Sequence, residues 1–210
     1  ALPISQEGSR VIVIGLTGGI GTGKTEVTHV LRELGAVVFE SDKLAHSSYE
    51  PGTEAHRQIV RSFGEEVLSD SGFIDRKALG EIVFADPARR LELEEIVWPA
   101  TRKLTLASLK DEENRGTEIV VVEVPKLFES GWDKLADAIW TVESPTGEID
   151  KRVKDRSGLS KSEVDARVAA QLTREQRIDK ADVQIVNDGT LEDLRAQILR
   201  IWESIPKTQK

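Results

Sequence analysis

One glycine-rich segment near the start of the chain limits the possible folds more than any other feature. Residues 18–25 read GGIGTGKT and satisfy the pattern G-x-x-x-x-G-K-[ST]. An apolar run at residues 11–14 precedes this segment, and apolar residues with helical spacing follow it, at Val27, Val30, Leu31 and Leu34. A second apolar run lies at residues 36–40. This order of strand, glycine-rich turn, helix and strand predicts a βαβ unit.

The residue types of this segment suit the binding of phosphate groups, and we call residues 18–25 the phosphate loop. Glycines let the backbone N–H groups point inward at phosphate oxygens, Lys24 can reach the β- and γ-phosphates, and Thr25 offers a hydroxyl to Mg²⁺. A glycine-rich turn can fit the pattern by chance, but its position between a strand and a helix favours nucleotide binding. The predicted nucleotide-binding residues are Gly18, Gly19, Ile20, Gly21, Thr22, Gly23, Lys24 and Thr25.

Five apolar runs predict strands at residues 11–14, 36–40, 119–124, 138–142 and 183–186. Most are nearly continuous in Val and Ile, which is typical of strands buried on both faces of a parallel sheet. We expect an α/β fold of the P-loop NTPase type, with a three-layer core, a five-stranded parallel sheet, a helical insertion and a helical lid. A final helix should begin at Thr190 and bury Leu191, Leu194, Ile198 and Ile201.

The same patterns divide the chain into parts. Residues 1–10 read as a polar leader, and residues 11–42, 117–145 and 181–210 as the nucleotide-binding core. Residues 43–116 are predicted to be a helical domain for an acceptor substrate, with apolar positions at Ile59, Phe63, Leu79, Val83, Leu91 and Ile96. Residues 146–180 are predicted to form a lid that contains a capping box at Ser160 and Glu163.

Composition excludes several classes of protein. The 210 residues carry a net charge of −8, which argues against a general nucleic-acid binder. There are no cysteines, so thiolate metal sites and cysteine nucleophiles are excluded. No apolar run approaches the roughly 20 residues of a membrane span. We expect a cytoplasmic enzyme with no membrane association and no obligate protein partner.

A phosphate loop alone is shared by GTPases, ATPase motors and small-molecule kinases, so other segments must decide the class. Residues 151–180 hold nine Lys and Arg against five Asp and Glu, whereas the rest of the chain sums to −12. A basic helical segment of this kind can close over a triphosphate and stabilise charge on the transferring group. A solvated charged helix is the alternative reading.

Two carboxylates are expected at the carboxyl edge of the sheet, where such folds bind ligands. Asp42, in the sequence Glu40-Ser41-Asp42, is the candidate to orient or deprotonate an acceptor hydroxyl, although it could instead cap a helix. Glu123, at the end of the third strand, is the candidate to support Mg²⁺ together with Thr25. Its alternative reading is a strand-end charge that faces solvent.

The chain resembles the dephospho-CoA kinase family along nearly its whole length. Residues 15–25 (GLTGGIGTGKT) are very similar to the family's loop, and Asp42 with Ala45 and His46 resembles its second-strand motif. Further matches follow in family order: residues 72–79 with Arg76, residues 83–87, 93–99 and 124–129, then Arg152, Arg156, Gln171, Arg174, and residues 181–189.

This resemblance implies transfer of the γ-phosphate of ATP to the ribose 3′-hydroxyl of dephospho-CoA, with Mg²⁺ as cofactor. It implies that Asp42 is the base or positioning group and that Lys24, Arg152 and Arg156 neutralise the γ-phosphoryl group. Asn187 and Gly189 would then lie near the adenine of ATP. On the acceptor side it places Glu40, Ser41, His46, Arg76, Trp98 and Lys126.

Three places depart from the family pattern, and all lie on the acceptor side. Glu40-Ser41 replaces Asp-Ala, Trp98 replaces a histidine, and Lys126 replaces a leucine. Ordinary drift explains such changes, but they also leave open a paralogue that phosphorylates another nucleoside- or nucleotide-like hydroxyl. A remoter alternative is a nucleotide-binding regulatory protein without transfer activity.

Overall fold

A computed structural model describes residues 10–145, 168 and 171–205 of the chain. These residues form two compact units: residues up to 39 and from 112 onward make the first, and residues 40–111 make the second. The first unit contains the sheet and the phosphate loop. The second unit is helical.

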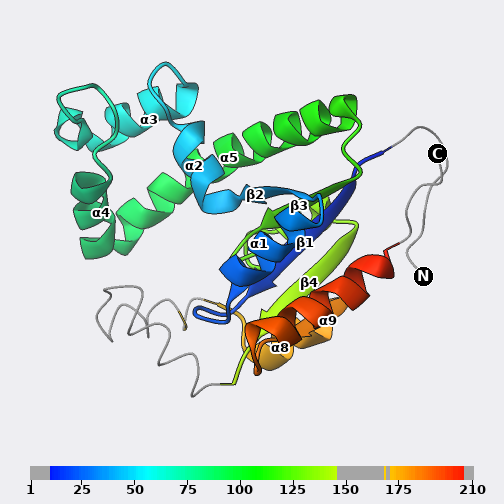
Figure 1. Cartoon of the computed structure of the whole chain (residues 1–210). Coiled ribbons are helices and arrows are strands. Elements are labelled where there is room, and N and C mark those ends of the chain that lie inside the picture. Colours follow the sequence, from blue (N-terminus) through cyan, green and yellow to red (C-terminus); the bar gives the residue numbers. More distant parts are fainter. Residues whose placement is uncertain (1–9, 146–167, 169–170, 206–210) are drawn as a thin grey trace. The chain divides into compact units, whose positions relative to one another are not determined.

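The sheet has five strands: β1 (Ile12–Gly18), β2 (Val37–Glu40), β3 (Ile119–Glu123), β4 (Ala138–Glu143) and β5 (Val183–Val186). Their order across the sheet is β2-β3-β1-β4-β5, so β1 lies in the centre (Figure 1). Its pairings with β3 and β4 are parallel, as is that of β4 with β5. The predicted α/β fold with a five-stranded parallel sheet is confirmed.

Strand β1 is longer than the apolar pattern predicts. It continues past Ile14 through Gly15 to Gly18, which is paired with Val142 of β4. Gly15 breaks the apolar run in the sequence, but a side chain there would come within 2.7 Å of Leu127 Cδ1. Glycine at position 15 therefore lets the strand pass close to Leu127. The strand ends at Gly18, which is also the first residue of the phosphate loop.

Two helices, α1 (Lys24–Glu33) and α9 (Leu191–Glu203), lie side by side against one face of the sheet (Figure 1). Helix α1 buries Val27, Val30 and Leu31, as the helical spacing predicts. Burial of these side chains together with Ile14 and Leu16 supplies the hydrophobic free energy that fixes the helix on the sheet.

Helix α9 begins as predicted, because Thr190 caps it in a capping box with Asp193. The prediction that Leu191 points inward is wrong: its side chain is 65% exposed. The buried stripe consists of Leu194, Ile198 and Trp202, at four-residue spacing. Helical side chains lean toward the N-terminus, so Leu191, at the first helical position, extends past the end of the helix. The short helices η2 (Trp132–Leu135) and α8 (Arg174–Lys180) complete the described elements of this unit.

The second unit is formed by α2 (Ser41–Ser48), α3 (Glu54–Phe63), η1 (Glu65–Val67), α4 (Arg76–Ala85) and the main part of α5 (Pro87–Arg115). Its core contains Ile59, Phe63, Val67, Ile74 and Leu79. Leu91, one of the apolar positions with helical spacing, lies in α5 and is 57% exposed. Among the described residues, no helix is long and apolar enough to cross a membrane.

Candidate nucleotide-binding site

The phosphate loop joins the end of β1 to the start of α1. Gly23 is the N-cap of α1 and adopts the left-handed conformation, with φ of 97°, which favours glycine. Its N-cap position offers no side-chain hydrogen bond to the first turn. The first N–H groups of a helix have no partner within the helix and carry its positive dipole end, so this end of α1 suits an anion.

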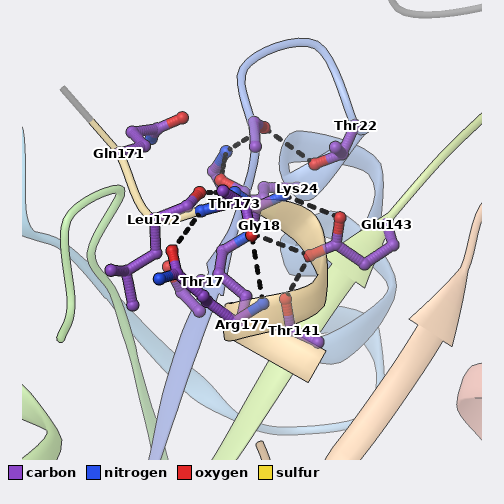
Figure 2. A network of polar contacts seen from close by, with 12 residues as sticks. Thr17, Gly18, Thr22, Lys24, Thr141, Glu143, Gln171, Leu172, Thr173 and Arg177 are labelled. Atoms are coloured by element: carbon purple, nitrogen blue, oxygen red, sulfur yellow. Dashed lines mark hydrogen bonds and ion pairs between the residues drawn. The ribbon is translucent and has the colours of Figure 1, made fainter. Parts of the chain in front are cut away.

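Lys24 lies folded against the loop. Its Nζ donates to the carbonyl oxygens of Gly18 and Gly19, both at 2.9 Å. Thr22 is fully buried, and its hydroxyl also donates to the Gly19 carbonyl at 2.9 Å. These contacts fix the curvature of the loop and hold a cation beside its backbone (Figure 2). The side chain of Thr25 is exposed in the first turn of α1.

Asn187 lies against the phosphate loop although 165 residues separate it from Thr22. Its side-chain Nδ2 donates to the Thr22 carbonyl at 2.9 Å, and its backbone N–H donates to the Glu143 carbonyl at 2.7 Å. The Asn187 carbonyl in turn accepts from Ser144 Oγ at 2.7 Å. Asn187 is therefore a brace between β4 and the loop. Gly189, which the family resemblance places near the adenine together with Asn187, is two residues further on, in the exposed turn before α9.

A buried ion pair stands beside the loop, and sequence reasoning missed it. Arg177 of α8 donates from Nε and Nη2 to the two carboxylate oxygens of Glu143, each at 2.8 Å. The Glu143 carboxylate also accepts from Thr141 Oγ1 at 2.6 Å, and Arg177 Nη1 donates to the Leu172 carbonyl at 2.6 Å (Figure 2). The signal that could have found the pair is a glutamate at the end of a largely apolar, buried strand.

The loop after β3 contacts the segment that precedes α8. Gln171 Nε2 donates to the Pro125 carbonyl at 2.9 Å, and the Leu172 N–H donates to Glu129 Oε1 at 2.6 Å. Lys126 lies half-buried in this loop. Glu123 is the last residue of β3, paired with Leu16 of β1, and its side chain is half-buried.

The second unit gathers several of the predicted acceptor-side residues. Asp42 is exposed in the first turn of α2, where Glu40 rather than Asp42 is the N-cap, so the capping alternative is wrong. Glu40 pairs with Lys43 at 2.9 Å. Ser41 is 9% exposed, and Trp98 is 43% exposed on α5.

His46 and Arg76 are in contact within this unit. Arg76 Nη1 lies 3.1 Å from His46 Nδ1, and an arginine can only donate in such a bond, so the ring nitrogen accepts. Burial lowers the pKa of His46, Arg76 lowers it further, and Asp42 opposes both. The His46 ring also meets Tyr49 edge-on, with ring centroids 6.0 Å apart. The structure thus brings His46 and Arg76 together, and the lowered pKa favours the neutral imidazole.

Some predicted features lie outside the described residues. These are Arg152, Arg156 and the capping box of Ser160 and Glu163. Within residues 10–145, 168 and 171–205, no group of three or more His, Cys, Asp or Glu side chains is arranged to hold a metal ion.

A parallel sheet with a complete phosphate loop between its central strand and the first helix defines the class of P-loop nucleotide-binding proteins. The comparisons with known proteins give the family. A family model described as dephospho-CoA kinase matches residues 12–193. The chain belongs to the dephospho-CoA kinase family and is a kinase that uses ATP.

Relatives agree with this assignment, and a solved structure shares the fold. The chain is 43% identical over 192 residues to a dephospho-CoA kinase of Symbiobacterium thermophilum. The matched residues cover 91% of this chain and 80% of the relative. It is 44% identical over 190 residues to that of Geobacter sulfurreducens, covering 90% of this chain and 96% of the relative. A crystal structure of a Thermus thermophilus protein superposes with a TM-score of 0.79 at 36% identity, covering 94% of this chain and 99% of that protein.

Proposed function

We propose that this protein transfers the γ-phosphoryl group of ATP to the ribose 3′-hydroxyl of dephospho-CoA, the final step of coenzyme A synthesis. The complete phosphate loop, with Lys24 held beside its backbone, carries the proposal for phosphoryl transfer. Family membership supports the acceptor. Because the reaction consumes ATP, we propose the cytoplasm as its compartment.

The reaction requires one bond to form and one to break. The ribose 3′-oxygen attacks the γ-phosphorus, the bond from that phosphorus to the β,γ-bridging oxygen breaks, and the hydroxyl proton leaves. We assign Asp42 as the group that orients the hydroxyl and accepts its proton, since its carboxylate is exposed and can reach a ligand. Lys24, Arg152 and Arg156 would neutralise charge on the transferring group.

The residues at the loop also fit Mg²⁺. This ion keeps several waters and binds through one or two protein ligands plus substrate phosphates, so it does not require a cluster of carboxylates. The exposed hydroxyl of Thr25 and the carboxylate of Glu123, at the end of β3, are the groups that would hold it. When bound, the ion would neutralise charge on the β- and γ-phosphates.

On the acceptor side we assign His46 and Arg76 to the binding of dephospho-CoA. Arg76 supplies a permanent cation that suits a phosphate group. The neutral His46 imidazole leaves that cation without a competing positive charge beside it. Residues 40–111 would then form the acceptor unit and the remaining core the nucleotide unit.

An acceptor assay tests the proposal directly. Purified protein with ATP and Mg²⁺ should convert dephospho-CoA to a product one phosphate heavier, identified as coenzyme A by mass spectrometry. Asp42→Asn should reduce kcat by about 10²- to 10⁴-fold, the range for loss of a general base. Asp70→Asn, which neutralises another exposed carboxylate in the same unit, is the matched control and should leave kcat unchanged. Turnover of a different nucleoside with no turnover of dephospho-CoA would refute the acceptor.

A further inference from the structure

The Arg177–Glu143 pair is one of the most deeply buried charged contacts of the first unit. The Glu143 side chain is 1% exposed and the Arg177 side chain 9% exposed. A second arginine–glutamate pair, Arg195 with Glu33, has exposures of 47% and 40%. Burial of an ion pair costs desolvation free energy that mutual attraction only partly offsets, so such a pair is weak evidence for a role in stability.

The guanidinium of Arg177 touches the phosphate loop itself. A Cβ atom built on Gly19 would lie 3.1 Å from Arg177 Nη2, so the guanidinium occupies the space that a side chain would need. That same Nη2 is 2.8 Å from Glu143 Oε2. Gly18, the preceding loop residue, is paired with Val142, the residue before Glu143. The loop that would bind a triphosphate thus lies next to a buried carboxylate, with an arginine between them.

The charge of Glu143 affects how the phosphate loop can bind an anion. An unpaired buried carboxylate would oppose the approach of a highly charged anion, because attraction and repulsion are both stronger away from bulk water. The bidentate contact with Arg177 neutralises that carboxylate, and the Thr141 hydroxyl occupies a further site on Oε1. Arg177 Nη1, bound to the Leu172 carbonyl, keeps the guanidinium in place.

We propose that Arg177 is a positioning residue of the phosphate loop, which masks the negative charge of Glu143 beside Gly19 and so permits the loop to accept a triphosphate. The proposal rests on the proposed function in that the loop binds a nucleotide. It does not depend on which acceptor is used. Arg177 acts here through Glu143 and the loop, without contact to the reacting atoms.

The charge argument predicts opposite effects of two substitutions that break the same pair. Arg177→Met leaves the Glu143 carboxylate unmasked and should weaken ATP binding at least tenfold. Glu143→Gln leaves the cation and should keep the Kd for ATP within threefold of the parent value or make it lower. The double variant removes both charges and should recover most of the binding lost in Arg177→Met. Isothermal titration with a non-hydrolysable ATP analogue measures each Kd.

Steady-state kinetics adds a readout that a merely structural role would not move. In Arg177→Met, the KM for ATP should rise and the KM for dephospho-CoA should stay unchanged. Arg195→Met and Glu33→Gln break the exposed pair and serve as controls, with no change in the Kd for ATP. Since the titration needs no acceptor, failure of the proposed acceptor leaves this test intact.

Thermal denaturation of every variant establishes that it is folded. If Arg177→Met does not fold, Arg177→Lys keeps the positive charge and should bind ATP within threefold of the parent protein. Equal weakening of ATP binding in Arg177→Met and Glu143→Gln would overturn the proposal. It would mean that the ion pair supports the loop structurally and does not act by neutralising the carboxylate. A tenfold loss in Arg177→Lys, or an unchanged Kd in Arg177→Met, would overturn it as well.

Discussion

Substitution of Gly18 by alanine tests how tightly the phosphate loop is bound to the sheet. The new Cβ would lie 2.4 Å from the Val142 carbonyl oxygen, and the residue would keep a φ of 150° that L side chains rarely adopt. We expect about 1–3 kcal/mol of backbone strain and, because a paired strand cannot easily move aside, about 1–3 kcal/mol more from overpacking. A loop displaced by about 1 Å should also lose roughly 10²-fold in kcat/KM.

Gly35→Ala is the matched control for this substitution. Gly35 also has a positive φ, of 99°, but an added Cβ would meet nothing within 4 Å. Both variants have backbone strain from the positive φ, but only in Gly18→Ala does the new Cβ clash with the Val142 carbonyl oxygen. Thermal denaturation should therefore place the Tm of Gly18→Ala lower by roughly 2–12 °C, at about 2–4 °C per kcal/mol. Equal Tm values, or equal kcat/KM for ATP, would refute the inference that the sheet fixes the loop.

Three further predictions concern single side chains. Lys24→Met should lower kcat by about 10²- to 10³-fold with little change in Tm, because it removes the cation that we propose neutralises charge on the transferring group; a change confined to KM would contradict this role. Asn187→Ala removes the bond to the Thr22 carbonyl and should cost about 1–3 kcal/mol in urea unfolding and raise the KM for ATP; an unchanged KM would contradict the brace. His46 has a lowered pKa in the folded protein, so its stabilising effect is complete above about pH 6.5 and is lost as pH falls through the folded-state pKa. Below about pH 6.5, the free energy of unfolding of the parent protein should therefore fall more steeply with decreasing pH than that of His46→Gln. Parallel plots of unfolding free energy against pH would contradict the lowered pKa of His46.

The central part of the fold could be predicted because several local signals agree there. The strand before the phosphate loop is apolar, the loop itself has fixed residue types, and α1 has a regular buried stripe ended by Gly35. Each of these signals depends on residues close in sequence. The prediction missed only the continuation of β1 to Gly18, since Gly15 and Thr17 interrupt the apolar pattern that marks a strand.

Contacts between distant segments could not be predicted in the same way. The brace from Asn187 to Thr22 spans 165 residues, and the pair of Arg177 with Glu143 spans 34. Nothing in the sequence distinguishes Arg177 from the other basic residues between 151 and 180, because a charge pattern reports composition and not burial. The packing of α8 against β4 is what separates it from a solvated side chain.

Contacts with distant segments also restrict which residues the phosphate loop accepts. Its pattern treats Gly19 as a free position, yet the guanidinium of Arg177 lies 3.1 Å from where a Cβ at Gly19 would be. In this chain the contact with Arg177, a tertiary neighbour, adds to one with Thr22 Cγ2 of the loop at 3.3 Å, and both restrict the residue at position 19. It follows that Gly19→Ala should be tolerated better when Arg177 is shortened than when it is present. A loop pattern therefore identifies the ligand class, and the residues packed beneath the loop decide which of its variable positions can vary.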